Sequence, residues 1–256
     1  MVPLKEKIVF ITGASAGIGL ACARAFAAQG ARLLLAARRA ERLEKLAAEL
    51  EASFGTKSHF IALDVRDRKA VEKAVAGLPA EWKEIEVLVN NAGLSRGLDK
   101  FQEGKSEDWE EMIDTNVKGL LYVSRAVLPG MIARGRGHVI NIGSIAGREV
   151  YPAGNVYCAT KFAAGALTKG MRLDLNGTGV RVSTVDPGLT ETEFSVVRFH
   201  GDAERAGKTY QGYTPLEPED IADAVIYCAT RPPHVDVAEM LVLPTDQAST
   251  TLVHRK

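Results

Sequence analysis

The sequence predicts an α/β protein with a doubly wound parallel sheet of about seven strands and helices on both faces. Three observations lead to this fold class. Short apolar runs alternate with longer segments of helical period, which is the pattern of repeated βαβ units. The apolar runs are nearly unbroken, as expected of strands covered on both sides. The length of 256 residues suits one such sheet, so we expect a single domain over residues 1–256.

The elements can be placed in chain order. Strands are expected at residues 8–11, 32–36, 60–63, 86–89, 138–142, 180–185 and 240–243. Helices are expected at residues 17–29, 40–52, 68–76, 106–134, 155–175 and 218–230. The helix at 40–52 carries Leu43, Leu46 and Leu50 at spacings of three and four, which places them on one face. Ser106 is a candidate N-cap for the longest of these helices.

One segment, residues 189–216, interrupts the alternation of strands and helices. It is rich in Thr, Glu and Gly and connects the sixth strand to the next helix. Loops of this length in compact domains are usually functional lids or disordered. Ligands of parallel sheets bind beyond the carboxyl ends of the strands, so we expect this segment to be a substrate lid.

The bulk composition argues against several classes of partner. Lys and Arg together number 32, as do Asp and Glu, so the net charge gives no reason to expect nucleic acid or an anionic membrane. No stretch approaches the ~18 apolar residues of a membrane span, and the charged N-terminus is not a secretory signal. Cys22, Cys158 and Cys228 form no CxxC pair, so we expect reduced core residues, a cytoplasmic protein and no metal site.

A glycine-rich stretch, residues 12–19, follows the first strand and opens the first helix. Its glycines permit a tight turn and a close approach of backbone to phosphate, and the helix N-terminus supplies N–H donors. The context favours a dinucleotide site over a turn that needs glycine for its own sake. The residues expected to contact the cofactor here are Gly13, Ser15, Ala16, Gly17, Ile18 and Gly19.

The end of the second strand selects the cofactor. An NAD site commonly has an acidic residue there, whereas this strand ends in Arg38 and Arg39. Arg can pair bidentately with a 2′-phosphate, so we predict NADP(H), with Arg38 favoured because it comes first. The alternative is a solvated start to the next helix. Asp64 and Val65 follow the third strand, where a carboxylate can reach an adenine amino group or cap a helix near Asp67.

A second candidate site is Tyr157-x-x-x-Lys161, whose spacing places both side chains on one helical face. A nearby ammonium favours the phenolate of a tyrosine, which could then exchange a proton with an alcohol or carbonyl oxygen. The alternative is a surface pair. Ser144 follows the fifth strand, where its hydroxyl could hold the substrate oxygen. Asn116 interrupts a largely apolar helical run, so its amide either satisfies a core hydrogen bond or anchors a water.

Together these motifs resemble the short-chain dehydrogenase/reductase family over essentially the whole chain. They occur in the family's order, as the glycine loop, Asn90-Asn-Ala-Gly93, Asn116, Ser144, Tyr157-x-x-x-Lys161 and Pro187-Gly188. The resemblance implies a Rossmann-like fold in which Tyr157 is the general acid/base and Ser144 orients the substrate oxygen. It also implies that Lys161 lowers the tyrosine pKa and binds the nicotinamide ribose, while Asn116 holds a water of the proton relay. The implied cofactor-lining residues are Asn90, Ala92, Gly93, Pro187, Gly188 and Thr190.

Several stretches, at residues 109–116, 126–131, 154–157 and 192–202, resemble the NADP-dependent 3-hydroxy acid dehydrogenases. That group oxidises serine, L-allo-threonine and related acids and reduces malonic semialdehyde. A substrate carboxylate needs a cation, and the candidates are Arg96, Arg148, Arg198 and Lys208. Two alternatives are a broad NADPH-dependent ketone or aldehyde reductase and a nucleotide-sensing regulator without catalysis.

The resemblance also implies a homotetramer built through the helices expected at 106–134 and 155–175. Both segments carry more apolar residues than one buried stripe requires. The residues in excess include Leu120, Leu121, Val123, Phe162 and Leu167.

Overall fold

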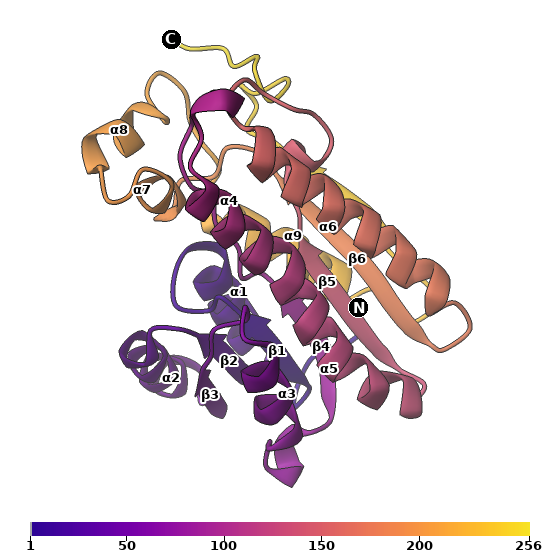
Figure 1. Ribbon diagram of the computed structural model, residues 1–256. Helices are drawn as coiled ribbons and strands as arrows, with labels where there is room; N and C mark the ends of the chain where they lie inside the picture. Colours follow the sequence, from indigo (N-terminus) through magenta and orange to yellow (C-terminus); the bar gives the residue numbers. More distant parts are fainter. Residues whose placement is uncertain (1) are drawn as a thin grey trace.

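The computed structural model describes residues 2–256, and within them the strands form one seven-stranded parallel sheet (Figure 1). The spatial order is β3-β2-β1-β4-β5-β6-β7, so the direction of winding reverses between β1 and β4. Such a switch point is where ligands bind in open α/β sheets. The strands are β1 (Ile8–Thr12), β2 (Arg32–Ala37), β3 (Ser58–Ala62), β4 (Ile85–Asn90), β5 (Gly137–Ile142), β6 (Val180–Pro187) and β7 (Glu239–Val242).

Helices cover both faces of this sheet, which confirms the predicted fold class. Helices α1, α2 and α9 pack on one face, and α3, α5 and α6 on the other. The helices are α1 (Gly17–Ala28), α2 (Ala40–Phe54), α3 (Arg68–Ala76), α4 (Ser106–Ile113), α5 (Leu120–Ala133), α6 (Asn155–Asp174), α7 (Phe194–Arg198), α8 (Ala203–Lys208) and α9 (Pro218–Ala229).

The strands are buried because each face has its own hydrophobic core. In β1, Val9 and Ile11 join the core under α1 and α9, whereas Ile8 and Phe10 join the core under α5. This alternation follows from the two-residue period of a strand and explains why the apolar run is unbroken. The three cysteines are buried and free, as expected of core residues, and burial raises the pKa of Cys22 to about 12.

The helix expected at 106–134 is interrupted. A π-helical turn, Asp114–Gly119, separates α4 from α5 and contains Asn116. Ser106, predicted to be an N-cap, is instead the first helical residue, and Lys105 precedes it without a side-chain cap. The sequence analysis did not place the π turn, because apolar residues lie on both sides of it, at 112–113 and 120–121, and resemble one continuous helical run. Such turns occur frequently at functional sites.

Residues 189–216 contain two short helices, α7 and α8, which lie together at one end of the sheet (Figure 1). An isolated bridge pairs Thr190 with Leu216 and closes the base of the segment. Its residues line a cavity together with the carboxyl ends of β2, β5 and β6. No helix within residues 2–256 is long and apolar enough to cross a membrane.

Candidate active site

A cavity of about 610 Å³ lies at the carboxyl end of the sheet, beneath residues 189–216. Its size suits a drug-sized or larger ligand. The cavity wall contains most of the residues expected to contact a cofactor, namely Gly13, Ser15, Ala16, Gly17, Ile18, Arg38, Arg39, Asp64, Val65, Ala92, Gly93, Pro187, Gly188 and Thr190. Residues of the C-terminal tail, which the sequence analysis did not consider, complete the wall: Gln247, Thr250, Thr251, Val253 and Arg255.

The glycine loop leaves bare backbone at one end of the cavity. Gly13 has φ +66°, and a Cβ built there would lie 2.8 Å from the Asn91 amide nitrogen. Asn91 holds the loop by donating to the carbonyl oxygens of Thr12 at 2.9 Å and Gly13 at 3.2 Å. Helix α1 begins at Gly17, and its N-cap, Ala16, supplies no side-chain hydrogen bond. The first-turn N–H groups are therefore left for an anion, as a pyrophosphate site requires.

Two residues expected on the cofactor do not line the cavity. Asn90 is buried in the sheet, where its side chain donates to Ser124 Oγ and Asn141 Oδ1, both at 2.9 Å. Its neighbour Asn91 faces the cavity instead, since consecutive side chains at the end of a strand point to opposite sides. Gly19 lies one turn into α1, where a Cβ would collide with Asn91 and the Gly13 carbonyl. Its role is therefore close packing of helix against loop.

The cavity wall beside Ser15 of the glycine loop carries two basic residues, Arg38 and Arg39. Arg39 donates from Nε and Nη2 to Ser15 Oγ, at 3.3 and 3.2 Å. Arg38 lies beside it with 54% of its side chain exposed, and its nearest carboxylate oxygen, on Glu111, is 3.7 Å away. Both guanidinium groups stay partly exposed to solvent, so neither is locked in a buried ion pair. This arrangement can accept a phosphate group, as predicted from the absence of an acid at the end of β2.

Asp64 and Val65 also line the cavity, but the Asp64 carboxylate already has a partner. Arg66 binds it through the Nε–Nη2 edge of its guanidinium, with Nη2 2.6 Å from Oδ2. Burial raises the pKa of Asp64, but the hydrogen bonds from Arg66 outweigh it and hold the pKa below its usual value. To accept a hydrogen bond from an adenine amino group, the Asp64 carboxylate would have to bind that group and Arg66 at the same time.

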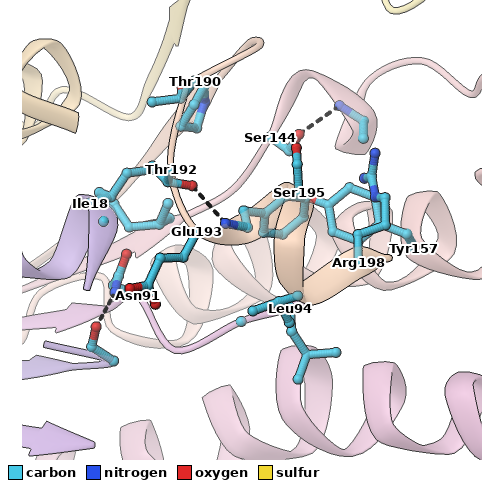
Figure 2. A pocket seen from close by; sticks show the side chains of 18 of the residues that line it. Ile18, Asn91, Leu94, Ser144, Tyr157, Thr190, Thr192, Glu193, Ser195 and Arg198 are labelled. Carbon is cyan, nitrogen blue, oxygen red and sulfur yellow. Dashed lines mark hydrogen bonds between the residues drawn. The ribbon is translucent and has the colours of Figure 1, made fainter. Parts of the chain in front are cut away.

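Ser144, Tyr157 and Lys161 all line the cavity. Figure 2 shows Ser144 and Tyr157 on the side away from Ile18 and Asn91. Ser144 ends the loop after β5, and its Oγ accepts a hydrogen bond from the Ala146 amide at 3.1 Å. Tyr157 and Lys161 stand one turn apart in α6, with Lys161 Nζ 6.0 Å from the centroid of the Tyr157 ring. Lys161 donates to the carbonyl oxygen of Ile142 at 2.9 Å.

The charges around Tyr157 include a cation that the sequence analysis did not place there. Burial raises the pKa of Tyr157 above its usual value, and the Arg198 guanidinium and the Ser144 hydroxyl oppose this rise. Burial also lowers the pKa of Lys161 to about 8. The Arg198 guanidinium is therefore a further cation that favours the phenolate. Sequence spacing missed it because 41 positions separate it from Tyr157 in the chain.

The side chain of Asn116 does not line the cavity, and the structure shows what it holds. Its Oδ1 accepts from the Leu94 amide at 2.9 Å, and its Nδ2 donates to the Leu94 carbonyl at 2.8 Å and to Thr160 Oγ1 at 3.0 Å. Of the two readings left open by the sequence, the side chain fits the first, a buried hydrogen bond. It ties the loop after β4 to the residue that precedes Lys161.

Two of the four cations considered for a substrate carboxylate are bound elsewhere. Arg96 pairs with Glu111 at 2.6 Å and donates to the Val197 carbonyl oxygen at 2.6 Å. Arg148 pairs with Asp186 at 2.7 Å, and Nη2 also contacts Glu239. Neither lines the cavity, so the expectation that either faces the substrate does not hold.

Lys208 is exposed and pairs with Glu204 in α8, also outside the cavity. Arg198, at the end of α7, is the one candidate on the cavity wall. Its Cζ lies 5.3 Å from the centroid of the Tyr157 ring, and Nη2 donates to Tyr151 Oη at 3.0 Å (Figure 2). Its Nε is buried and has no hydrogen-bond partner among residues 2–256. A buried donor in this state calls for an acceptor.

Comparison with known proteins agrees with this geometry. A family model described as short chain dehydrogenase matches residues 7–202. The NADP-dependent 3-hydroxy acid dehydrogenase YdfG of Salmonella typhi is 51% identical over 250 residues, which cover 97% of this chain and 99% of that protein. The NADP-dependent 3-hydroxy acid dehydrogenase of Schizosaccharomyces pombe is 44% identical, over 99% of this chain and 98% of its own.

A solved structure described as the closed form of serine dehydrogenase complexed with NADP+ has a TM-score of 0.91 and 48% identity to this chain. The match covers 97% of this chain and 100% of that one. The family model covers the glycine loop, the Tyr157 site and the strands β1 to β6, and the alignments with these relatives cover 97% or more of this chain. The chain therefore belongs to the short-chain dehydrogenase family of oxidoreductases, as its motifs predicted.

Proposed function

We propose that this protein transfers a hydride between NADP(H) and a short 3-hydroxy acid or its 3-oxo counterpart. The names of the relatives support both halves of the proposal. The observation that carries the substrate half is the placement of Arg198, the one candidate cation on the cavity wall, beside the ring of Tyr157.

The cofactor half rests on how well the residues of one end of the cavity fit NADP(H). The uncapped N-terminus of α1 suits the pyrophosphate, and Ser15, Arg38 and Arg39 suit a 2′-phosphate. Gly13 gives the backbone room for this approach. When bound, the nicotinamide supplies or accepts the hydride.

The remaining chemistry belongs to side chains of this protein. The Tyr157 hydroxyl exchanges a proton with the substrate oxygen, and Ser144 Oγ orients that oxygen beside it. Arg198 and the Ser144 hydroxyl lower the pKa of Tyr157 against the effect of burial. The Lys161 ammonium, held by the Ile142 carbonyl, adds positive charge and can bind a ribose hydroxyl. Asn116 fixes the loop and helix between which these groups lie.

The position of Arg198 limits the length of the substrate between its carboxylate and the carbon that reacts. Its guanidinium is close to the ring of Tyr157, so a carboxylate it binds can be only a few bonds from the carbon that reacts. In a 3-hydroxy acid two carbon–carbon bonds separate the two groups. The free Nε and the partly used Nη2 of Arg198 offer the bidentate edge that a carboxylate prefers.

The matching test compares 3-hydroxypropionate and serine with their methyl esters. We expect the acids to be preferred and Arg198→Lys to lower kcat/KM for the acids roughly 10- to 100-fold, because a charge-assisted hydrogen bond contributes about 1.5–3 kcal/mol. Lysine keeps the charge near Tyr157, so the esters should be affected far less. Lys208→Ala, a cation outside the cavity, is the matched control. Equal use of acid and ester would favour the broad carbonyl reductase instead.

We also propose that residues 189–216 are the substrate lid of a single domain, and that the protein acts in the cytoplasm. The lid proposal is supported by Thr192 and Arg198, which both line the cavity from above the sheet. The proposed compartment is supported by the three free, buried cysteines, which fit reducing conditions.

A homotetramer is proposed through α5 and α6. Leu121 and Phe162 are exposed there, as is Leu173 at 78%. Of the residues considered for this surface, Leu120 and Val123 are buried within the subunit and cannot contribute. Light scattering should give four times the mass of one chain, and a monomer at micromolar concentration would contradict the proposal.

A further inference from the structure

The lid contacts the phosphate-binding half of the cavity through one acidic residue, Glu193. Its carboxylate pairs with Arg39 at 3.0 Å and with Arg42 at 2.7 Å. The neighbouring lid residue, Thr192, packs 3.2 Å from the position of a Cβ on Gly17. In Figure 2, Glu193 lies toward the glycine loop and Arg198 lies beside Tyr157. The two ends of α7 therefore face the two halves of the cavity.

Arg39 presents two different edges. Its Nε and Nη2, the edge that binds oxyanions bidentately, face Ser15 on the cavity wall. Its Nη1 donates to Glu193, which also lines the cavity. The Glu193 carboxylate thus occupies a different donor nitrogen and leaves the Nε–Nη2 edge with Ser15.

Charge balance favours occupation of both edges together. Arg39 and Arg42 both pair with Glu193, and Arg38 next to Arg39 in the chain lies 3.7 Å from Glu111. Glu193 alone leaves one of the two positive charges of Arg39 and Arg42 unbalanced, and a phosphate monoester, with about −1.5 to −2 charges near neutral pH, supplies the missing negative charge. The hydrogen bonds from Arg42 and Arg39 hold the pKa of Glu193 below its usual value, although burial works in the opposite direction. Glu193 is therefore ionised at neutral pH.

We propose that Glu193 is a positioning residue that directs Arg39 toward the 2′-phosphate and makes lid closure depend on that phosphate. This inference rests on the proposed NADP(H) function. A cofactor without the 2′-phosphate makes no ion pair with the bidentate edge of Arg39. The contact between Arg39 and Glu193 then stabilises the closed lid less. Since Arg198 ends the same helix, the contact at Glu193 also steadies the residue that would bind the substrate carboxylate.

The test measures dissociation constants of NADP+ and NAD+ by calorimetry for the wild type, Glu193→Gln and Glu193→Asp. We expect Glu193→Gln to weaken NADP+ binding roughly three- to tenfold, since two half-exposed ion pairs are lost. NAD+ binding should change less than about twofold, and Glu193→Asp should recover part of the loss. Glu191→Gln is the matched control, because Glu191 is an exposed lid carboxylate for which no side-chain hydrogen bond or ion pair is found within residues 2–256.

Hydrogen exchange of the lid amides supplies a second readout that does not depend on turnover. In the wild type, NADP+ should protect residues 189–200 more than saturating NAD+ does, and Glu193→Gln should abolish the difference. Unchanged NADP+ affinity in Glu193→Gln, or equal weakening of both cofactors, would overturn the inference while leaving the NADP(H) function intact. A wild type that binds NAD+ as tightly as NADP+ would overturn the cofactor proposal and this inference with it.

Discussion

Replacement of Asn116 by alanine tests whether this residue acts through the architecture of the site. The substitution removes three hydrogen bonds and leaves the amide and carbonyl of Leu94 unpaired. Asn116 is only 4% exposed, so these groups cannot simply turn to bulk water. Thr160 keeps its own bond to the Tyr157 carbonyl and loses little.

The loss in the free energy of unfolding follows from the two backbone groups of Leu94 that the substitution leaves without a hydrogen bond. Each unsatisfied buried group costs roughly 1–3 kcal/mol, and entry of a water into the vacated space would recover part, so we expect a loss of about 2–4 kcal/mol. For a chain of this length 1 kcal/mol corresponds to roughly 2–4 °C in Tm. The variant should therefore melt roughly 4–16 °C below the wild type.

The assay is thermal unfolding followed by circular dichroism, together with kcat and KM at a temperature where both proteins are folded. Asn155→Ala is the control, because that amide makes one long bond to Asp99 at 3.4 Å and one local bond to Val156. It should cost less than about 1 kcal/mol. If Asn116→Ala lost turnover but melted within about 2 °C of the wild type, the hydrogen-bond reasoning would be refuted. Asn116 would then act on the proton relay directly.

Three further outcomes are expected. Tyr157→Phe should fold and bind NADPH, but its kcat should be roughly 10²- to 10⁴-fold lower, because only the hydroxyl that exchanges the proton is removed. Substantial residual activity would exclude Tyr157 as the acid/base. The sequence favoured Arg38 for the 2′-phosphate, but only Arg39 directs a bidentate edge at Ser15, so Arg39→Ala should reduce the preference for NADP+ over NAD+ roughly tenfold and Arg38→Ala less. The ratio of dissociation constants measures both effects, and an unchanged ratio in Arg39→Ala would contradict the choice of Arg39. The affinity for NADP+ should fall as the pH rises through about 8, because Lys161 loses its charge there. In a binding titration, Lys161→Met should remove this pH dependence. A dependence that persists in the variant would show that another group titrates.

Much of the fold and part of the site could be predicted from local patterns in the chain. Alternation of apolar runs with helical segments identifies a parallel sheet, because strands buried on both faces must be apolar throughout. The glycine loop could be assigned because strand, loop and helix adjoin in the chain. The same holds for Tyr157 and Lys161, which one helical turn brings to one face.

The choice among similar residues depended on contacts between distant parts of the chain. Arg96, Arg148 and Arg198 are equivalent cations in the sequence, yet Glu111 and Asp186 consume the first two and only the third remains on the cavity wall. Likewise, Glu193 meets Arg39 across 154 positions of the chain. Periodicity reports which face of an element is apolar, whereas ion pairs and pocket walls arise only when elements pack. For that reason the chemistry of the site could be read locally, but the identity of the cation beside Tyr157 and the link between lid and phosphate site required the folded chain.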